Sequence, residues 1–203
     1  MIGIFGGTFD PVHNGHLRTA LDVQQSLGLD ELRLIPLKDP PHREQPLCSP
    51  AQRLKMLQAA VANEPNLKID ERELERNGKS YSLYTLQSLR AELGEIPICL
   101  IIGQDAFQGF PNWHKPDEIL QLSHLVVMQR PGERPSDLYP ERLTDDPNKL
   151  QTTPAGKIFQ QPVTQLEISS TRIREMIERG ISPRYLLPDT VLEIIERDNL
   201  YRS

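Results

Sequence analysis

Cysteine is nearly absent from this chain. Cys48 and Cys99 are the only two among 203 residues, one in a proline-rich stretch and the other inside an apolar run. A small secreted protein held by disulfides carries many more cysteines, and a structural zinc site needs closely spaced cysteine and histidine ligands. We therefore expect two reduced thiols, no disulfide framework and no metal held by the protein itself.

Long apolar runs and an excess of positive charge are also missing. No stretch approaches the ~20 apolar residues of a membrane-spanning helix, and no charged-then-apolar leader opens the chain. The net charge of −5 argues against binding to nucleic acid or to an anionic membrane. We expect a cytoplasmic protein whose phosphate-binding cations are few and local. The sequence leaves the oligomeric state, monomer or dimer, open.

What the chain does contain is an alternation of short apolar runs with helix-like stretches, the pattern of an α/β domain with a parallel sheet. Strands are expected at 1–5, 32–37, 67–69, 96–102, 124–128 and 163–168. Helices are expected from Asn14 to Gly28, from the capping box at Ser49 onward, and at 82–93, 170–179 and 189–198. The prediction is a Rossmann-like open parallel sheet with helices on both faces and a small C-terminal helical extension.

The domain organisation follows from the same pattern. Residues 131–156 are polar and rich in proline, which indicates a long surface connection. The two helices after it are too few to form a core of their own. We therefore expect residues 1–203 to form a single domain.

Unusual segments follow five of the predicted strands. They are Gly-Gly-Thr-Phe at 6–9, Pro-Pro-His-Arg at 40–43, Gly-Gln-Asp at 103–105, Gln-Arg-Pro-Gly at 129–132 and Ser-Ser-Thr-Arg at 169–172. In an open α/β sheet, ligands bind beyond the carboxyl ends of the strands. The five segments therefore predict a ligand site at one edge of the sheet.

The first helix entrance carries the strongest indication of an anion site. Gly6, Gly7 and Thr8 allow a phosphate to approach the backbone, although an ordinary tight turn would also explain them. His13 and His16 then place two imidazoles where the helix dipole favours an anion, and the glycine between them leaves room for a ligand. This pairing favours a functional site over a structural turn.

A second helix entrance has similar chemistry. The hydroxyls of Ser170 and Thr171 can cap the helix or bind phosphate oxygens, and Arg174 lies one turn further along. A plain Ser/Thr cap with solvated arginines is the alternative interpretation. Because the His13–His16 pair already indicates one phosphate site, a second phosphate site is the better interpretation of these residues.

These residues carry a resemblance. The stretches GGTFDPVHNGH at 6–16 and ISSTRIR at 168–174 resemble the paired signatures of the HxGH nucleotidyltransferase superfamily. Within it, the chain resembles the bacterial nicotinate mononucleotide adenylyltransferases. That closer likeness rests on DPPHR at 39–43, IIGQDAF at 101–107, FPNWHK at 110–115, QRPG at 129–132 and the closing LLPDTVLEIIERDNLY. The likeness runs end to end except in the variable 133–156 region.

The resemblance implies a reaction in which ATP and nicotinate mononucleotide give nicotinic acid adenine dinucleotide and pyrophosphate, within NAD biosynthesis. The acceptor's 5′-phosphate attacks the α-phosphorus directly, so the protein needs no nucleophile or base of its own. Its task is alignment and charge stabilisation, with Mg²⁺ bridging the departing phosphates of ATP.

The resemblance also implies roles for individual residues. Thr8 and His16 would contact the α-phosphate, with His13 beside them, and Arg174 would hold the departing phosphates. The implied ATP site comprises Gly6, Gly7, Thr8, His13, His16, Gly103, Ser170, Thr171 and Arg174. The implied acceptor site comprises Phe9, His42, Arg43, Ser82, Asp105, Trp113, His114 and Arg130.

The resemblance implies a separate role for each group of residues in the acceptor site, with an alternative for two of them. His42 and Arg43 would clamp phosphate, and Asp105 would bind ribose hydroxyls unless it caps a helix. Trp113 would stack on the pyridine ring unless it is a core aromatic. Backbone N–H groups near Ser82 and His114 would receive the nicotinate carboxylate.

Three other functions compete with this one. A sister transferase acting on phosphopantetheine or another phosphorylated acceptor would share both end motifs but gives no reason for Trp113. A dinucleotide-binding oxidoreductase is disfavoured because no G-x-G-x-x-G follows the first strand. A catalytically silent nucleotide sensor shares the fold, but the intact His13, His16 and Arg174 disfavour it.

Overall fold

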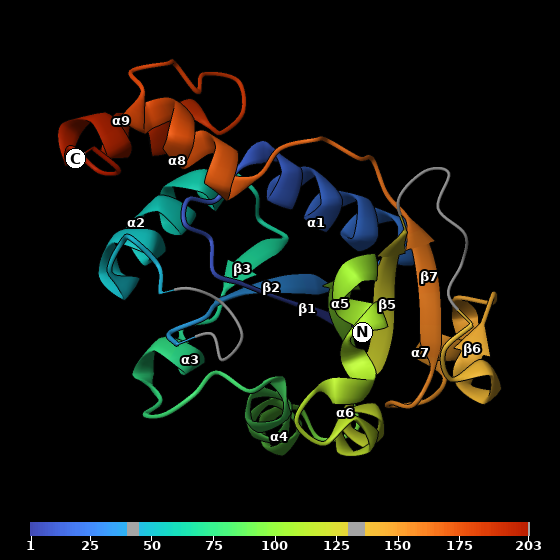
Figure 1. Cartoon of the computed structure of the whole chain (residues 1–203). Coiled ribbons are helices and arrows are strands. Elements are labelled where there is room, and N and C mark those ends of the chain that lie inside the picture. Colours follow the sequence, from blue (N-terminus) through green and yellow to red (C-terminus); the bar gives the residue numbers. More distant parts are fainter. Residues whose placement is uncertain (40–44, 130–136, 203) are drawn as a thin grey trace.

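A seven-stranded parallel sheet organises the chain (Figure 1). The computed structural model describes residues 1–39, 45–129 and 137–202. The strand order is β3-β2-β1-β4-β5-β7-β6. The strands are β1 (Ile2–Gly7), β2 (Glu31–Pro36), β3 (Leu67–Ile69), β4 (Ile98–Gly103), β5 (His124–Gln129), β6 (Leu143–Thr144) and β7 (Ile158–Pro162).

The described helices connect and cover these strands. They are α1 (Asn14–Leu27), α2 (Pro50–Val61), α3 (Arg72–Glu75), α4 (Ser82–Leu93), α5 (Gln104–Gln108), α6 (Pro116–Leu122), α7 (Asn148–Gln151), α8 (Ser170–Glu178) and α9 (Asp189–Arg197). Short 3₁₀ turns lie at Phe110–Asn112 and Pro140–Arg142. The expected capping box at Ser49 and the left-handed Gly28 at the end of α1 are both confirmed.

Hydrophobic clusters cover the two faces of the sheet. Alternate residues of β4 divide between them, with Cys99 and Ile101 on one side and Leu100 and Ile102 on the other. The first cluster includes buried residues of α1, α2, α8 and α9, and the second includes those of α4, α5 and α6. This confirms the predicted Rossmann-like class, because a strand buried on both faces requires cover on both.

The strand order reverses next to β1. Gly3 of β1 lies opposite Leu32 of β2 on one side and opposite Cys99 of β4 on the other. The chain runs outward from β1 through β2 to β3 and then returns to β4. Such a reversal opens a crevice beyond the carboxyl ends of the two central strands, where α/β proteins bind ligands.

The predicted strand at 163–168 is wrong. The strand is β7, at Ile158–Pro162, and residues 163–169 have no regular structure. Leu166 of the predicted strand is exposed, and Val163 and Ile168 are only partly buried. The backbone N–H of Thr164 donates to the Asp22 carboxylate of α1 at 2.6 Å. The chain therefore leaves the sheet at Pro162 and crosses α1 to reach α8 (Figure 1).

The region expected as a surface connection also contributes to the fold. Residues 130–136 lie outside the described part, but 137–156 include β6 and α7. β6 pairs with β7, and Leu150 of α7 is fully buried. β6 has two residues and α7 has four, too few to show a periodicity in this polar stretch of the sequence.

Candidate active site

The loop between β1 and α1 folds tightly back on itself. Phe9 has a left-handed φ of 49°, and its ring is buried against the end of β1. A Cβ added to Gly7 would lie 2.6 Å from that ring, so a larger residue would displace it. The peptide bond between Asp10 and Pro11 is cis. This loop carries the chain to the entrance of α1.

Two stacked histidines form that entrance. His13 is the N-cap of α1, and its Nδ1 accepts from the backbone N–H of His16 at 3.4 Å. The two imidazole rings stack with centroids 3.7 Å apart, and the ring of Phe9 meets His16 edge-on. A Cβ on Gly15 would lie 3.0 Å from the His13 ring, so glycine permits this packing. The structure thus brings together the predicted pair.

Burial determines the charge of the first histidine. His13 is 5% exposed, and desolvation lowers its pKa to about 4. The ring is therefore neutral at pH 7. A neutral imidazole that accepts at Nδ1 carries its proton on Nε2. His13 can thus donate one hydrogen bond to a ligand at the helix entrance without placing a full positive charge there.

Thr8 has an unused hydrogen-bonding group. Its hydroxyl oxygen is shielded from solvent and has no hydrogen-bond partner within the described ranges. Buried polar atoms are nearly always paired, so such an atom calls for a ligand. Its position directly after the glycines of β1 suits an oxygen of a phosphate.

The start of α8 lies against the same loop. Ser170 donates its hydroxyl proton to the carbonyl of Pro11 at 2.9 Å, and Arg174 Nη1 donates to the carbonyl of Asp10 at 2.8 Å. Arg174 Nη2 also contacts the Thr171 hydroxyl at 3.4 Å. The two predicted anion sites therefore adjoin each other, although the partners of these two contacts are 159 and 164 positions apart in sequence. Ser169, rather than Ser170, caps the helix.

Gly103 and Asp105 follow the central strand as expected. Gly103 is the N-cap of α5 and makes no side-chain cap, while Asp105 lies exposed in the first turn. The alternative role of Asp105 as the helix cap is therefore wrong. Between them, Gln104 is buried and its Oε1 has no partner among the described residues. Sequence reasoning passed over Gln104 because a lone amide carries no motif.

Two of the predicted acceptor residues, Ser82 and His114, come close together at the start of α4. The ring of Tyr81, directly before Ser82, lies 4.8 Å from that of His114, and the hydroxyl of Tyr84 lies 3.5 Å from His114 Nε2. Trp113 is half-buried, with its ring 5.4 Å from that of Phe110. It therefore packs on the core and keeps part of its surface open.

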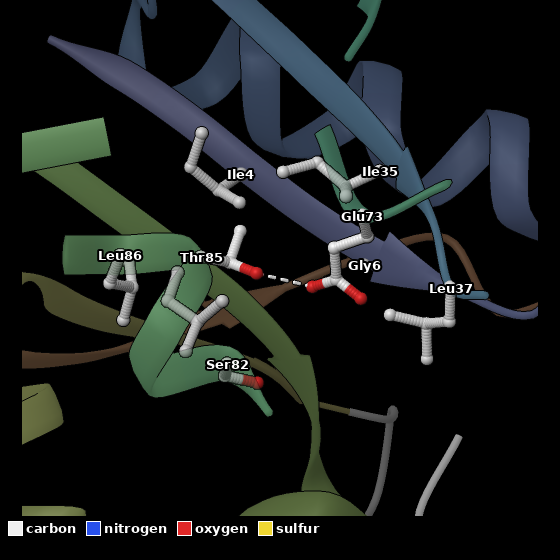
Figure 2. A pocket seen from close by; sticks show the side chains of 9 residues that line it. Ile4, Gly6, Ile35, Leu37, Glu73, Ser82, Thr85 and Leu86 are labelled. Atoms are coloured by element: carbon white, nitrogen blue, oxygen red, sulfur yellow. Dashed lines mark hydrogen bonds between the residues drawn. The ribbon is translucent and has the colours of Figure 1, made fainter. Parts of the chain in front are cut away.

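A small cavity lies beside the start of α4, as Figure 2 shows. It measures about 20 Å³ and is lined by Gly6 of β1, Ser82 and Thr85 of α4, Glu73 of α3 and apolar side chains of the sheet. Glu73 is 3% exposed; Thr85 donates to its Oε1, while its Oε2 has no partner in the described structure. Sequence reasoning passed over Glu73, because this residue stands in a run of charged residues typical of a solvated surface.

Some predicted residues lie outside the described part of the chain. These are His42, Arg43 and Arg130. Across residues 1–39, 45–129 and 137–202, no three His, Cys, Asp or Glu side chains are grouped to hold a metal ion. No helix in that same part has the length and apolar character needed to cross a membrane.

The chain is similar to known proteins over most of its length. The model of the cytidylyltransferase-like family matches residues 4–176. The chain is 50% identical to a probable nicotinate-nucleotide adenylyltransferase of Methylococcus capsulatus over 99% of each chain. It is 46% identical to one of Halorhodospira halophila over 98% of this chain and 94% of that protein.

A solved structure shows the same fold. The nicotinic acid mononucleotide adenylyltransferase of Plasmodium falciparum complexed with NaAD matches with a TM-score of 0.76. The match covers 98% of this chain and 96% of that chain at 15% identity. At this identity the likeness concerns the fold alone.

Proposed function

The chain belongs to the cytidylyltransferase-like family, and we propose that it transfers AMP from ATP to nicotinate mononucleotide, as a step of NAD biosynthesis. The products are nicotinic acid adenine dinucleotide and pyrophosphate. The observation that carries the proposal is the junction of the His13–His16 entrance with Arg174 of α8. This junction would supply the imidazoles of His13 and His16 as hydrogen-bond donors on one side of a phosphate chain and the Arg174 guanidinium on the other.

The proposed chemistry is an in-line displacement. An oxygen of the acceptor's 5′-phosphate forms a bond to the α-phosphorus of ATP, and the bond from that phosphorus to the bridging oxygen of pyrophosphate breaks. The attacking oxygen is already anionic, so no base is required. The hydroxyl of Thr8 and the ring of His16 would donate to the α-phosphate, and His13 Nε2–H would bind beside them.

The start of α8 would hold the departing phosphates. Arg174 is charged and donates several hydrogen bonds, so it can bind phosphate while keeping its bond to Asp10. Ser170 gives its hydroxyl proton to Pro11, so it would bind through its backbone N–H, with Thr171 beside it. Mg²⁺ would arrive with ATP and neutralise the charge of the pyrophosphate that leaves.

The acceptor would lie between α4 and residues 113–114. Trp113 would stack its open face on the pyridine ring, and backbone N–H groups at Ser82 and His114 would receive the carboxylate. Asp105 would bind ribose hydroxyls near Gly103, and Phe9 would close the site below. Because ATP and pyridine mononucleotides are cytoplasmic metabolites, we propose a cytoplasmic enzyme in which residues 1–203 act as one domain.

Pyrophosphate release from ATP and Mg²⁺ tests the proposal directly. The acceptor panel contains nicotinate mononucleotide, nicotinamide mononucleotide and phosphopantetheine. We expect nicotinate mononucleotide to give the highest kcat/KM. Fastest release with phosphopantetheine would establish the sister transferase instead. Binding of ATP without release of pyrophosphate in the presence of any of the acceptors would establish a nucleotide sensor.

A further inference from the structure

The C-terminal end of the chain reaches the phosphate-binding loop. Tyr201 donates its hydroxyl proton to Asp10 Oδ1 at 2.7 Å, across 191 positions of sequence. Asp10 is 4% exposed and lies in the loop between Gly7 and His13. No motif predicts this contact, because the two residues share no local pattern.

Asp10 gathers donors from a second distant segment. Its Oδ2 accepts from the backbone N–H of Leu47 at 2.8 Å, and its Oδ1 accepts from that of Cys48 at 3.3 Å. Its backbone carbonyl accepts from Arg174. One loop residue is therefore bonded to the segment before α2, to α8 and to the C-terminus. Three donors on one carboxylate fix its position and direction.

The Tyr201 hydroxyl stays a donor at any physiological pH. Burial raises the pKa of Tyr201, and the negative charge of Asp10 raises it further. The phenol therefore stays protonated and donates its proton in the hydrogen bond to the carboxylate. Cys48 beside it is also protonated, because burial raises its thiol pKa to about 11.

Arg53 of α2 also holds this loop in place through hydrogen bonds. Its side chain is fully buried, and it donates to the carbonyl of Thr8 at 2.6 Å and to that of Cys48 at 3.3 Å. The carbonyl of Thr8 and the carboxylate of Asp10 are thus both fixed, two residues apart. Between the glycines and His13, the backbone has little freedom left.

We propose that Tyr201 and Asp10 act together as a latch that positions Thr8, His13 and His16 for phosphoryl transfer. This inference rests on the proposed function, in which alignment rather than a nucleophile accelerates the reaction. A displacement of ~1 Å at such a site costs roughly 10²-fold in rate. Both are positioning residues, since the Tyr201 hydroxyl and the Asp10 carboxylate bond to each other and the carboxylate also bonds to backbone N–H groups.

The test uses Tyr201→Phe, Asp10→Asn and their combination in the full-length protein. Tyr201→Phe removes only the hydroxyl, and kcat should fall by about 10-fold while each KM changes by less than about 3-fold. Asp10→Asn turns an amide donor toward backbone donors and should lower kcat further. The double variant should be no slower than Asp10→Asn alone, because residues that act through one another are not additive.

Leu200→Ala is the matched control for a purely structural role. Leu200 is buried in the same turn but contacts the hydrophobic cluster rather than Asp10. It should lower Tm at least as much as Tyr201→Phe and leave kcat near wild type well below the transition. Equal kcat losses in the two variants, or additive losses in the double variant, would overturn the latch.

Amide hydrogen exchange supplies a readout that needs no turnover. In Tyr201→Phe, the amides of Leu47 and Cys48 should exchange faster than in Leu200→Ala, since their acceptor is no longer held. Unchanged exchange together with unchanged kcat would contradict the proposal. Failure of the proposed function would appear differently, as a wild-type protein that releases no pyrophosphate while the exchange result still holds.

Discussion

The His13–His16 pair shows how local packing sets the chemistry of a residue. His13 is neutral because it is buried, and a nearby helix entrance supplies partial positive charge without desolvating an ion. Stacking at 3.7 Å keeps both rings pointed at the same region. The proposed site therefore binds anions mainly through oriented donors, which remain in place as charge shifts from one phosphate to another.

His16→Ala should lower kcat by at least ~10²-fold with a smaller effect on ATP binding, because the donor acts most strongly on charge that develops at the α-phosphate. Steady-state kinetics and ATP titration of the folded variant measure the two effects. His16→Gln retains an N–H donor and should recover part of the rate. A His16→Ala variant within a few-fold of wild type would remove His16 from the catalytic residues.

The ionisation of His13 predicts a dependence of stability on pH. Its pKa is 6.5 in the unfolded chain and about 4 in the folded protein. The unfolded state therefore binds more protons between these values. The contribution of His13 to the free energy of unfolding should be fully present above pH 6.5 and be lost as the pH drops toward 4, by roughly 2–4 kcal/mol.

Urea unfolding of wild type and His13→Asn at pH 7 and pH 4.5 measures that contribution. The variant should lose less stability than wild type over this interval. His124, buried in β5 and also lowered in pKa by desolvation, contributes in the same direction in both proteins. An equal loss in wild type and variant would show that His13 does not titrate as its burial predicts.

At the scale of elements, α8 holds the loop between β1 and α1 in place and is proposed to bind the departing phosphates. Arg174 ties it to the carbonyl of Asp10, and the same guanidinium is proposed to hold the departing phosphates. Arg174→Ala should raise the KM for ATP and lower kcat, leaving the acceptor KM nearly unchanged. Lysine should restore only part of the activity, because it lacks the planar fork.

Arg172→Ala is the control for this prediction, since Arg172 is exposed on the same helix. Its kinetics should match wild type. A change confined to the acceptor KM in Arg174→Ala would mean that the two phosphate sites are assigned the wrong way round.

Contacts between α3 and α4 make a second prediction. Thr85 donates to the buried Glu73 and accepts from Arg76 at 3.2 Å, which joins the two helices beside the cavity in Figure 2. Thr85→Val leaves that carboxylate without its donor and should destabilise the fold by ~1–3 kcal/mol. Thr85→Ser keeps the hydroxyl and should recover most of this. Chemical denaturation measures the stability of both variants. Equal stability of the valine and serine variants would contradict this role of the Thr85 hydroxyl.

Choice of acceptor belongs to the whole molecule, because α4 and residues 113–114 meet only when the sheet is assembled. The proposed stacking on Trp113 would not distinguish nicotinate from nicotinamide, whereas the two proposed backbone donors would favour a carboxylate over an amide. A buried donor–donor mismatch costs ~1–3 kcal/mol, and the loss of charge-assisted bonds adds to it. We expect at least ~10²-fold preference for nicotinate mononucleotide in kcat/KM.

Trp113→Ala separates stacking from selection. Both acceptors should weaken by similar factors, and the preference should persist. Measurement of kcat/KM for both acceptors in wild type and variant decides each half. Equal use of the acceptors by wild type would contradict the carboxylate pocket, and a lost preference in the variant would make Trp113 the selecting residue.

The sequence by itself determined the features that depend on near neighbours along the chain. The capping box at Ser49, the burial of β4 on both faces and the entrance at His13–His16 all follow from spacing, residue type and the geometry of one turn. The parallel sheet then places the segments after its strands at one edge. The position of Gly103 was predictable for this reason, whereas Ser170 and Arg174 follow an irregular segment rather than a strand.

Only the tertiary structure decided which distant groups meet. It moved the last long strand from 163–168 to Ile158–Pro162 and directed Ser170 to Pro11. It also paired Glu73 with Thr85 and brought Tyr201 to Asp10. These partners are separated by 12 to 191 positions. Their hydrogen bonds depend on how whole elements pack, and no spacing within the chain records that.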